Sequence, residues 1–462
     1  MDSSPETPET PEPLDHAAHA AHADHHSRST DPLVTRLTAR GVHGVALTWV
    51  DNAGLTRVKA VPLARLGPAA ERGVGMSPVF DVYLVDDSMT SSRHTGGPDG
   101  DLRLVPDLDR LTALAGQPGW AWAPVDRFDQ GGRRYRGCQR HFARRMADRA
   151  AERGLRLRMG FETEWVVTRD GAPAATGPAY GMTRIVELSA YADELLTALA
   201  AQGLDVLQLH PEYAPGQFEV SVAPSDPVRA ADEAVLVRET IRAVSLAHGL
   251  TPAFGPAVAP GTVGNGRHLH LSLWDGERNL CAGGEGPFGM TSRAESFLAG
   301  VLAALPELLA VGAPSPASHL RLEPSRWAGA FQCWGLENRE AALRFITGAP
   351  DDPAAANAEV KCFDPAANPY LVVGSVIAAG LAALDSGATL PEPVSGDPAG
   401  QEQPRLPTSL PQSLDLFRGS AVLREAMGDE LFEAFAAVRA AEVELFAAHT
   451  PDELAAATRE RY

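Results

Sequence analysis

Leu157-Arg-Met-Gly-Phe-Glu162-Thr-Glu164-Trp-Val166 is an apolar strand pattern in which two glutamates stand at alternate positions. Successive side chains of a strand point to opposite faces, so Glu162 and Glu164 share one face, about 7 Å apart, and the apolar residues share the other. Three further stretches repeat this alternation with Glu, His, Ser or Lys on the polar face: Gly216-Gln-Phe-Glu219-Val-Ser-Val222, Arg267-His268-Leu-His270-Leu-Ser272-Leu273 and Ala358-Glu359-Val-Lys361-Cys-Phe363.

The polar face of one such strand ordinarily meets only water. Four strands that carry acids or histidines on this face favour a functional site instead. Carboxylates gathered on one concave face repel one another and need a positive partner. Oxygen ligands with an occasional imidazole suit magnesium or manganese, so the sequence predicts a metal-dependent active site.

The length, composition and charge of the chain exclude several classes of protein. At 462 residues and 44% apolar content, the chain is long enough for two domains with a sizeable core. Its formal net charge of −19 argues against nucleic acid or an anionic membrane as a partner. The chain has neither an apolar run of about 18 residues nor a signal-type N-terminus. Since its four cysteines are scattered without a CxxC pair, we expect a cytoplasmic protein with reduced thiols.

The chain divides into three expected parts. Residues 1–31, rich in Pro, Ala and His, should form a disordered tail rather than a metal site. Residues 32–128 should form a small α/β domain, and residues 129–462 a larger domain that opens with a helix over 138–154. In the small domain we expect a hairpin over 45–61, a helix near 62–72 and strands at 79–85 and 119–125. In the large domain we expect helices near 188–203, 226–248, 291–311 and 369–385, an exposed loop over 390–411, two helices over 411–447 and a last one from 451.

Seven stretches, in this order along the chain, resemble the glutamine synthetase family. They are Gly100-Asp-Leu-Arg-Leu-Val-Pro-Asp107, Gly160-Phe-Glu-Thr-Glu-Trp165, Pro211-Glu-Tyr-Ala-Pro-Gly-Gln-Phe-Glu219, Gly264-Asn-Gly-Arg-His-Leu-His-Leu-Ser-Leu-Trp274, Arg321-Leu-Glu-Pro324, Trp334-Gly-Leu-Glu-Asn-Arg-Glu-Ala-Ala-Leu-Arg344 and Glu359-Val-Lys-Cys-Phe-Asp-Pro-Ala-Ala-Asn-Pro-Tyr-Leu371. The resemblance implies an α+β fold, with a small β-grasp-like N-terminal domain and a large catalytic domain whose curved antiparallel sheet lines the site.

The resemblance also implies a reaction. Members of this family phosphorylate the γ-carboxylate of glutamate with ATP, and an amine then displaces the phosphate. Two or three Mg²⁺ or Mn²⁺ ions neutralise the phosphate oxygens. The ligands of the ion beside glutamate match Glu164, Glu212 and Glu219. The ligands of the ion that bridges the nucleotide phosphates match Glu162, His268 and Glu359. The strand alternation alone selects five of these six.

Four residues match positions that bind glutamate or the transferring phosphate. Arg321 matches the arginine that binds a carboxylate of glutamate, and Gly264 matches a backbone contact in the glycine-rich turn. Arg339 and Arg344 match the arginines that stabilise the transferring phosphate. This task suits the rigid guanidinium fork.

On the nucleotide side, His270 and Ser272 match positions that bind ATP.

Three residues in the motifs depart from the family. Trp327 stands in place of the glutamate of a flap, Lys361 in place of an arginine, and Val263 in place of an asparagine. Trp327 and Lys361 are still expected to bind substrate.

The acceptor region departs most. Residues 75–80 match the segment in which true glutamine synthetases carry an acid that binds and deprotonates ammonium, and here the segment has none. Trp327 can offer a ring face to an organic ammonium or pack on its alkyl part. Both changes resemble the ligases of this family that join glutamate to organic amines. A polyamine would favour extra carboxylates, so we expect a small amine such as ethanolamine, unless the entrance is lined by Asp81, Asp86, Asp87 or Glu323.

Two alternatives stay open: an ammonium-using glutamine synthetase, and a catalytically inactive homologue with a structural or regulatory role. The intact set of charged side chains speaks against the second, because burying them without a function is unfavourable. The resemblance further implies a ring homo-oligomer, a dodecamer of two stacked six-membered rings, whose sites are completed by the N-terminal domain of a neighbour. No tyrosine lies between Tyr370 and Tyr462, so adenylylation in the loop 390–411 is not expected.

Overall fold

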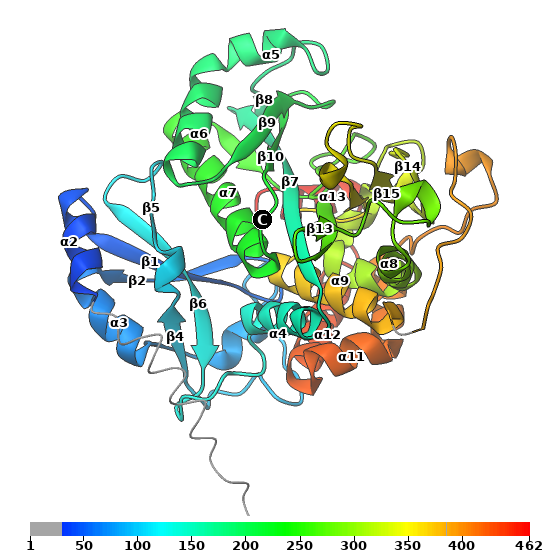
Figure 1. Cartoon of the computed structure of the whole chain (residues 1–462). Helices are drawn as coiled ribbons and strands as arrows, with labels where there is room; N and C mark the ends of the chain where they lie inside the picture. Colours follow the sequence, from blue (N-terminus) through cyan, green and yellow to red (C-terminus); the bar gives the residue numbers. More distant parts are fainter. Residues whose placement is uncertain (1–29, 385) are drawn as a thin grey trace, which may run out of the picture.

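The computed structural model describes residues 30–384 and 386–462, which form two sheets with helices packed around them (Figure 1). The predicted tail lies outside the described residues except for its last two, and helix α2 (Asp31–Ala39) begins at the second of these. The strands of one sheet fall between residues 44 and 128, and those of the other between 156 and 360. We keep the division into domains at 128/129 as a proposal, because the two sheets lie on either side of it.

Within the described residues, the first sheet has six strands. β1 (Gly44–Val50) and β2 (Thr56–Pro62) form the predicted hairpin, and β6 (Trp120–Phe128) pairs with β1 in parallel. β6 continues to β4 (Leu102–Pro106) and β3 (Val74–Met76), and also pairs with β5 (Thr112–Ala113). A 3-10 turn (Leu63–Arg65) and α3 (Leu66–Arg72) confirm the helix near 62–72.

The strand predicted over 79–85 is wrong. Pro78–Val82 forms a 3-10 helix, and the hydroxyl of Ser77 accepts a hydrogen bond from Val79 N at 3.3 Å. Pro78 fixes the backbone angle of the first helical residue, which favours a helical turn after a capping serine. The apolar pattern that suggested a strand instead buries Val82 and Val85 against neighbouring segments.

The second sheet has ten strands among the described residues, and its central path is β14-β15-β16-β12-β7-β10-β9. All pairs on this path are antiparallel except β14–β15, which is parallel, so the sheet is antiparallel along the site as predicted. The path comprises β14 (Phe331–Leu336), β15 (Ala341–Ile346), β16 (Asn357–Val360), β12 (Leu269–Asp275), β7 (Arg156–Arg169), β10 (Gln217–Val222) and β9 (Val206–Pro211). The short strands β8 (Ala172–Pro173) and β11 (Thr251–Ala253) pair with β7, and β13 (Arg278–Asn279) pairs with β12.

The helices of the second part cover the apolar face of this sheet. Met159, Phe161, Trp165, Phe218 and Leu271 are buried in one core with α4, α7, α8 and α9. The helices are α4 (Gln139–Glu152), α5 (Met182–Glu187), α6 (Ser189–Ala201), α7 (Pro227–Ala247), α8 (Ser292–Gly312) and α9 (Pro369–Leu384). The polar face of each strand therefore points away from this core, as the alternation predicts.

Helix α8 is the one helix of the described residues that is long and apolar enough to cross a membrane. Of its most apolar window, 67% is buried inside the molecule. It packs closely against α9, as a core helix does.

The C-terminal region contains three helices over 410–445 where we predicted two. They are α10 (Leu410–Gly419), α11 (Ala421–Met427) and α12 (Asp429–Leu445), and α13 (Pro451–Thr458) follows as predicted. Ser420 caps the start of α11, and Gly428, at φ +79°, ends it. The loop over 390–411 is only partly exposed, because Leu390, Val394 and Leu406 are buried.

A buried ionic network joins the first sheet to the helices of the second part. Arg140 on α4 donates two hydrogen bonds of 2.9 Å to Asp232 on α7. It also donates to Asp126 on β6 at 2.9 Å and to Asp107 at 2.6 Å. The hydroxyl of Tyr370 on α9 donates to Asp232 at 2.7 Å. One arginine thus links four segments that are far apart in the sequence.

Candidate active site

The polar faces of the predicted strands meet at one cavity of about 870 Å³. Pairing of the strands fixes which side chains are adjacent: Glu219 on β10 lies opposite Glu164 on β7, and His270 on β12 lies opposite Glu359 on β16. His268 lies just before β12, since the strand begins at Leu269. We call this the active-site cavity; its lining includes Glu162, Glu164, Glu212, Glu219, Gly264, His268, Arg321, Trp327, Arg339, Arg344 and Lys361.

Glu162, His268 and Glu359 form the first ligand group. The Nδ1 atom of His268 lies 3.0 Å from Glu162 Oε2 and 3.2 Å from Glu359 Oε1, and His270 Nε2 lies 3.1 Å from Glu162 Oε1. Burial alone would raise the pKa of Glu162, but hydrogen bonds to the two histidines hold it well below its usual range. Burial would likewise raise the pKa of Glu359, but Lys361 and the histidines lower it. Each carboxylate is therefore ionised against a positive neighbour.

Glu164, Glu212 and Glu219 form the second group, with His210 among them. His210 lies between two carboxylates, with Nδ1 3.4 Å from Glu212 Oε1 and Nε2 3.3 Å from Glu219 Oε1. Burial, followed by the charges of Glu164 and Glu219, raises the pKa of Glu212 to about 7. The hydroxyl of Tyr180 donates to Glu212 Oε2 at 2.9 Å. This second group carries more negative charge than its protein neighbours balance.

The donors in both groups fit divalent cations. Glu162, His270 and Glu359 have ligand atoms within 4.8 Å of one another, and so do His210, Glu212 and Glu219; carboxylate oxygens with one imidazole are a set that suits magnesium or manganese. Burial, and after it the neighbouring carboxylates, raise the pKa of Glu212, as expected where acids gather in a cavity. The sequence reasoning missed His210, although Gln208, His210 and Glu212 alternate with Leu207 and Leu209 in and just after β9. It treated His270 as a nucleotide contact, whereas His270 also lies beside Glu162 and Glu359.

Arg321 lines the cavity beside His268. It is buried, and its Nη2 atom donates to Lys361 O at 3.1 Å and lies 3.1 Å from His268 Nε2. Its Nη1 atom has no hydrogen-bond partner among the described residues, so this donor is available to a ligand. Gly264 must stay glycine, because a Cβ there would come within 2.0 Å of Pro256 O.

The remaining predicted residues fall into two sets. Lys361 Nζ donates to Glu359 Oε1 at 3.1 Å, and Arg344 donates to Glu359 Oε2 at 3.0 Å and also to Glu337. Arg339 lines the cavity with Arg344. His270 and Ser272 do not line it: the Ser272 hydroxyl accepts from Trp274 Nε1 at 2.9 Å.

Trp327 stands on a turn with unusual backbone geometry. Ser325 and Trp327 both have positive φ, at +56° and +55°, a region that bulky residues rarely adopt. The turn is held by Glu340, whose Oε1 accepts from Trp327 N at 2.7 Å, and by Asp397, which accepts from the Ser325 hydroxyl at 3.0 Å. Trp327 is 58% exposed and lines the cavity, so the turn presents this residue to the cavity and to solvent.

The four acids whose presence at the entrance would favour a polyamine do not line the active-site cavity of their own chain. Asp81 is buried against Arg127 at 2.7 Å, and Asp87 pairs with Arg57. Asp86 accepts hydrogen bonds from Ser88, and Glu323 is exposed elsewhere. The segment 75–80, in β3 and the turn after it, is also absent from the lining.

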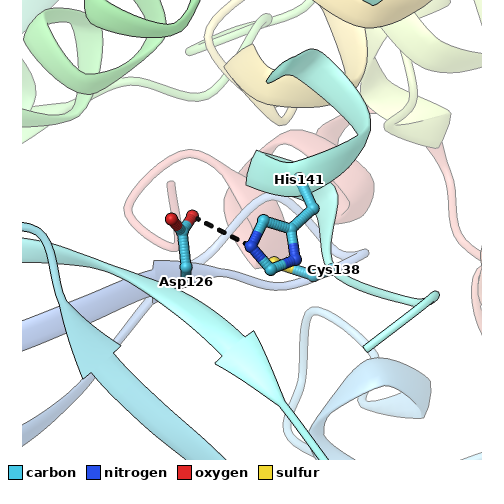
Figure 2. Close-up of side chains that lie close together, drawn as sticks. All are labelled: Asp126, Cys138 and His141. Carbon is cyan, nitrogen blue, oxygen red and sulfur yellow. Dashed lines mark ion pairs between the residues drawn. The ribbon is translucent and has the colours of Figure 1, made fainter. Parts of the chain in front are cut away.

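A further cluster of possible metal ligands stands apart from this cavity. Figure 2 shows Asp126 facing His141 at the start of α4, with Cys138 beside them, and their ligand atoms lie within 4.8 Å of one another. Arg140 and Arg144 also contact Asp126, which disfavours a bound cation. Although burial alone would raise the pKa of Cys138, His141 lowers it to about 6. The pKa of His141 rises to about 9 despite burial.

Comparisons with known proteins show what this chain is similar to. A family model described as the glutamine synthetase catalytic domain matches residues 136–456. The chain is 57% identical over 442 residues to the gamma-glutamylpolyamine synthetase GlnA3 of Streptomyces coelicolor, covering 92% of this chain and 95% of that protein. It is 27% identical over 423 residues to a glutamate–isopropylamine ligase of a Pseudomonas species, covering 86% and 91%. A crystal structure described as a novel glutamine synthase homologue superimposes with a TM-score of 0.84 at 30% identity, over 91% of this chain and 99% of that one.

Proposed function

Because the chain belongs to the glutamine synthetase family, whose members join glutamate to ammonia or an amine using ATP, we propose that the acceptor of this ligase is a polyamine. The likeness to GlnA3 over nearly the whole of both chains carries this proposal. The formal net charge of −19 also favours the approach of a multiply charged cation. The family membership and the α+β fold confirm the resemblance on which the sequence analysis relied.

We assign the metal-binding roles as the resemblance implies. Glu164, Glu212 and Glu219 would hold one divalent cation beside glutamate. Glu162, His268 and Glu359 would hold another beside the nucleotide phosphates. Bound Mg²⁺ or Mn²⁺ supplies positive charge that neutralises phosphate oxygens during transfer.

We propose that the arginines bind substrate oxygens. The unpartnered Nη1 atom of Arg321 would donate to a carboxylate of glutamate, and the backbone at Gly264 would contact the same substrate. Arg339 and Arg344 would contact the phosphate that moves from ATP to the γ-carboxylate. Arg344 holds Glu359 and Glu337 in this structure, so its guanidinium is already oriented within the cavity. His270 and Ser272 are proposed to support the nucleotide.

The order of the reaction steps follows from these positions. A γ-carboxylate oxygen attacks the terminal phosphorus of ATP, forming the acyl phosphate and releasing ADP. The free amine then attacks the acyl carbon, the C–O bond to phosphate breaks, and the nitrogen loses a proton to give the γ-glutamylamide. The rings of Trp327, Tyr180 and Tyr213 line the cavity and would pack against the alkyl part of the amine, which ammonium lacks.

A matched pair of amines tests the acceptor. With saturating ATP and glutamate, 1,4-diaminobutane should give kcat/KM about tenfold or more above that of 1-aminobutane, because one extra charge–carboxylate contact is worth about 1.4 kcal/mol or more. The two molecules have the same carbon chain and differ only in the second ammonium group. Phosphate release at equal free-base concentration measures the ratio.

Ethanolamine and ammonium complete the same panel. Ethanolamine as the best acceptor would restore the expectation drawn from the sequence, and ammonium as the best acceptor would make the protein an ordinary glutamine synthetase. Either result would refute the polyamine proposal.

We also propose that the protein forms a ring homo-oligomer, a dodecamer, in which the N-terminal region of one subunit completes the cavity of its neighbour. The absence of residues 75–80 from the lining of their own cavity supports this arrangement. Light scattering should give a mass twelve times the 48.9 kDa of one chain. A fully active monomer would contradict the proposal.

A further inference from the structure

A second cavity of about 650 Å³ adjoins the active-site cavity at Trp327. Both linings include Ser325, Trp327 and Arg339, so the turn that carries the indole forms the wall between them. We call this space the Trp327 cavity. Besides the shared residues, its lining includes Phe288, Glu337, Glu340 and Asp397.

The lining of the Trp327 cavity combines aromatic faces with carboxylates. Phe288 is 39% exposed and Trp327 58% exposed, so both rings are accessible to a ligand. Glu340 and Asp397 accept hydrogen bonds only from neutral groups in the described part of the chain: Glu340 from Trp327 N, and Asp397 from the Ser325 hydroxyl and Ala399 N. Glu337 differs, because it is paired with Arg344. Two carboxylates of this cavity therefore lack a basic partner.

Glu340 gives an independent sign that a cation belongs here. It is 7% exposed, and its Oε2 atom is buried with no hydrogen-bond partner among the described residues. A buried carboxylate without a positive partner is unfavourable. Burial raises its pKa and the charge of Asp397 adds to the effect, whereas hydrogen bonds from the backbone and the charge of Lys361 reduce it. Its field extends into the adjoining space, where the low local dielectric strengthens attraction of a positive group.

We propose that the Trp327 cavity binds the distal ammonium group of a diamine or polyamine whose proximal amine enters the active-site cavity. This inference rests on the proposed function and names the residues that would set its specificity. The two aromatic rings face the alkyl chain and the cation, which suits cation–π contact, and Glu340 and Asp397 supply the opposite charge. These are the extra carboxylates that sequence reasoning did not find. Arg339 is the basic residue of this lining. It lies in the wall shared with the active-site cavity, where we propose that it contacts the transferring phosphate.

Replacing Glu340 with glutamine tests the subsite. The amide oxygen can still accept from Trp327 N, so the turn is retained while the charge is removed. In the full-length protein, Glu340→Gln should lower the ratio of kcat/KM for 1,4-diaminobutane to that for 1-aminobutane about tenfold, the equivalent of about 1.4 kcal/mol. The change should appear in the KM of the diamine, while the KM values of glutamate and ATP stay within about twofold of wild type.

Two further variants keep the test decisive. Asp397→Asn, on an exposed loop, should lower the same ratio about threefold, since one carboxylate remains. Glu392→Gln removes an exposed acid of the same loop that does not line the cavity, and it should leave the ratio unchanged. A triamine longer than 1,4-diaminobutane serves as the second probe, because its distal ammonium group lies farther from the reacting amine.

The outcomes distinguish failure of the proposed function from failure of the proposed subsite. If the wild type does not prefer the diamine to 1-aminobutane, the proposed function fails. If the wild type prefers the diamine but Glu340→Gln and Asp397→Asn keep that preference with both probes, the polyamine function holds and the subsite is refuted. Equal losses for both amines would mean that Glu340 only positions Trp327, which also overturns the subsite.

Discussion

Glu164→Gln should lower glutamate-dependent phosphate release from ATP about a thousandfold, because the change removes charge where phosphate transfer needs a bound cation. The carboxylate of Glu164 accepts from Gly266 N at 2.9 Å and from Gln217 Nε2 at 3.1 Å. Glutamine keeps the volume and one accepting oxygen, so the fold should persist. Far-UV circular dichroism and a thermal unfolding curve check this beside the rate.

Glu277 supplies the matched control. It is an exposed glutamate in the turn between β12 and β13 of the same sheet, and Glu277→Gln should leave the rate unchanged. Exhaustive chelation of the wild type should abolish turnover, and added Mg²⁺ or Mn²⁺ should restore it. Normal activity in Glu164→Gln, or turnover that survives chelation, would refute the metal-centred mechanism.

Asp232→Ala should give the largest loss of stability, about 4 kcal/mol, since it removes a buried carboxylate that accepts three hydrogen bonds and leaves Arg140 with only the partly buried Asp107 and Asp126 as acidic partners. Asp232 is fully buried and receives two hydrogen bonds from Arg140 and one from Tyr370. Arg140 is 4% exposed and cannot reach bulk water instead. Urea denaturation followed by tryptophan fluorescence measures the change.

The control for this variant is Asp415→Ala. Asp415 is an exposed acid whose side chain is 79% accessible and lies 3.9 Å from Arg418, and exposed pairs of this kind contribute little. Its unfolding curve should overlay the wild-type curve. A loss below about 1 kcal/mol for Asp232→Ala would show that the network at Arg140 is not a principal link between the sheets.

Local periodicity predicted the part of the site that lies on strands. Glu162, Glu164 and Glu219 follow from alternation within β7 and β10, because a strand fixes the face of each side chain. His210 was missed although Gln208, His210 and Glu212 alternate with Leu207 and Leu209 in and just after β9. Its contact with Glu219 comes from the pairing of β9 with β10, and that pairing cannot be predicted from the sequence of one strand.

The contacts around Trp327 were also beyond sequence reasoning. Glu340 is 13 residues away in the chain, and Asp397 belongs to a loop that we expected to be simply exposed. Both reach the turn through tertiary packing. The helices at 62–72 and 138–154 were predictable because their apolar spacing is local, whereas the strand predicted at 79–85 failed because Pro78 and the Ser77 cap outweighed the apolar pattern.

Because the backbone at Trp327 is left-handed, substitutions here that raise thermal stability are expected to lower selectivity for the amine. A bulky residue at φ +55° is strained by about 1 kcal/mol or more relative to glycine, which adopts this conformation freely. Directed evolution that selects only for heat tolerance will therefore drift toward glycine at this position. Such variants will survive heating better and discriminate less between amines, so a library built for durability must be screened on acceptors as well.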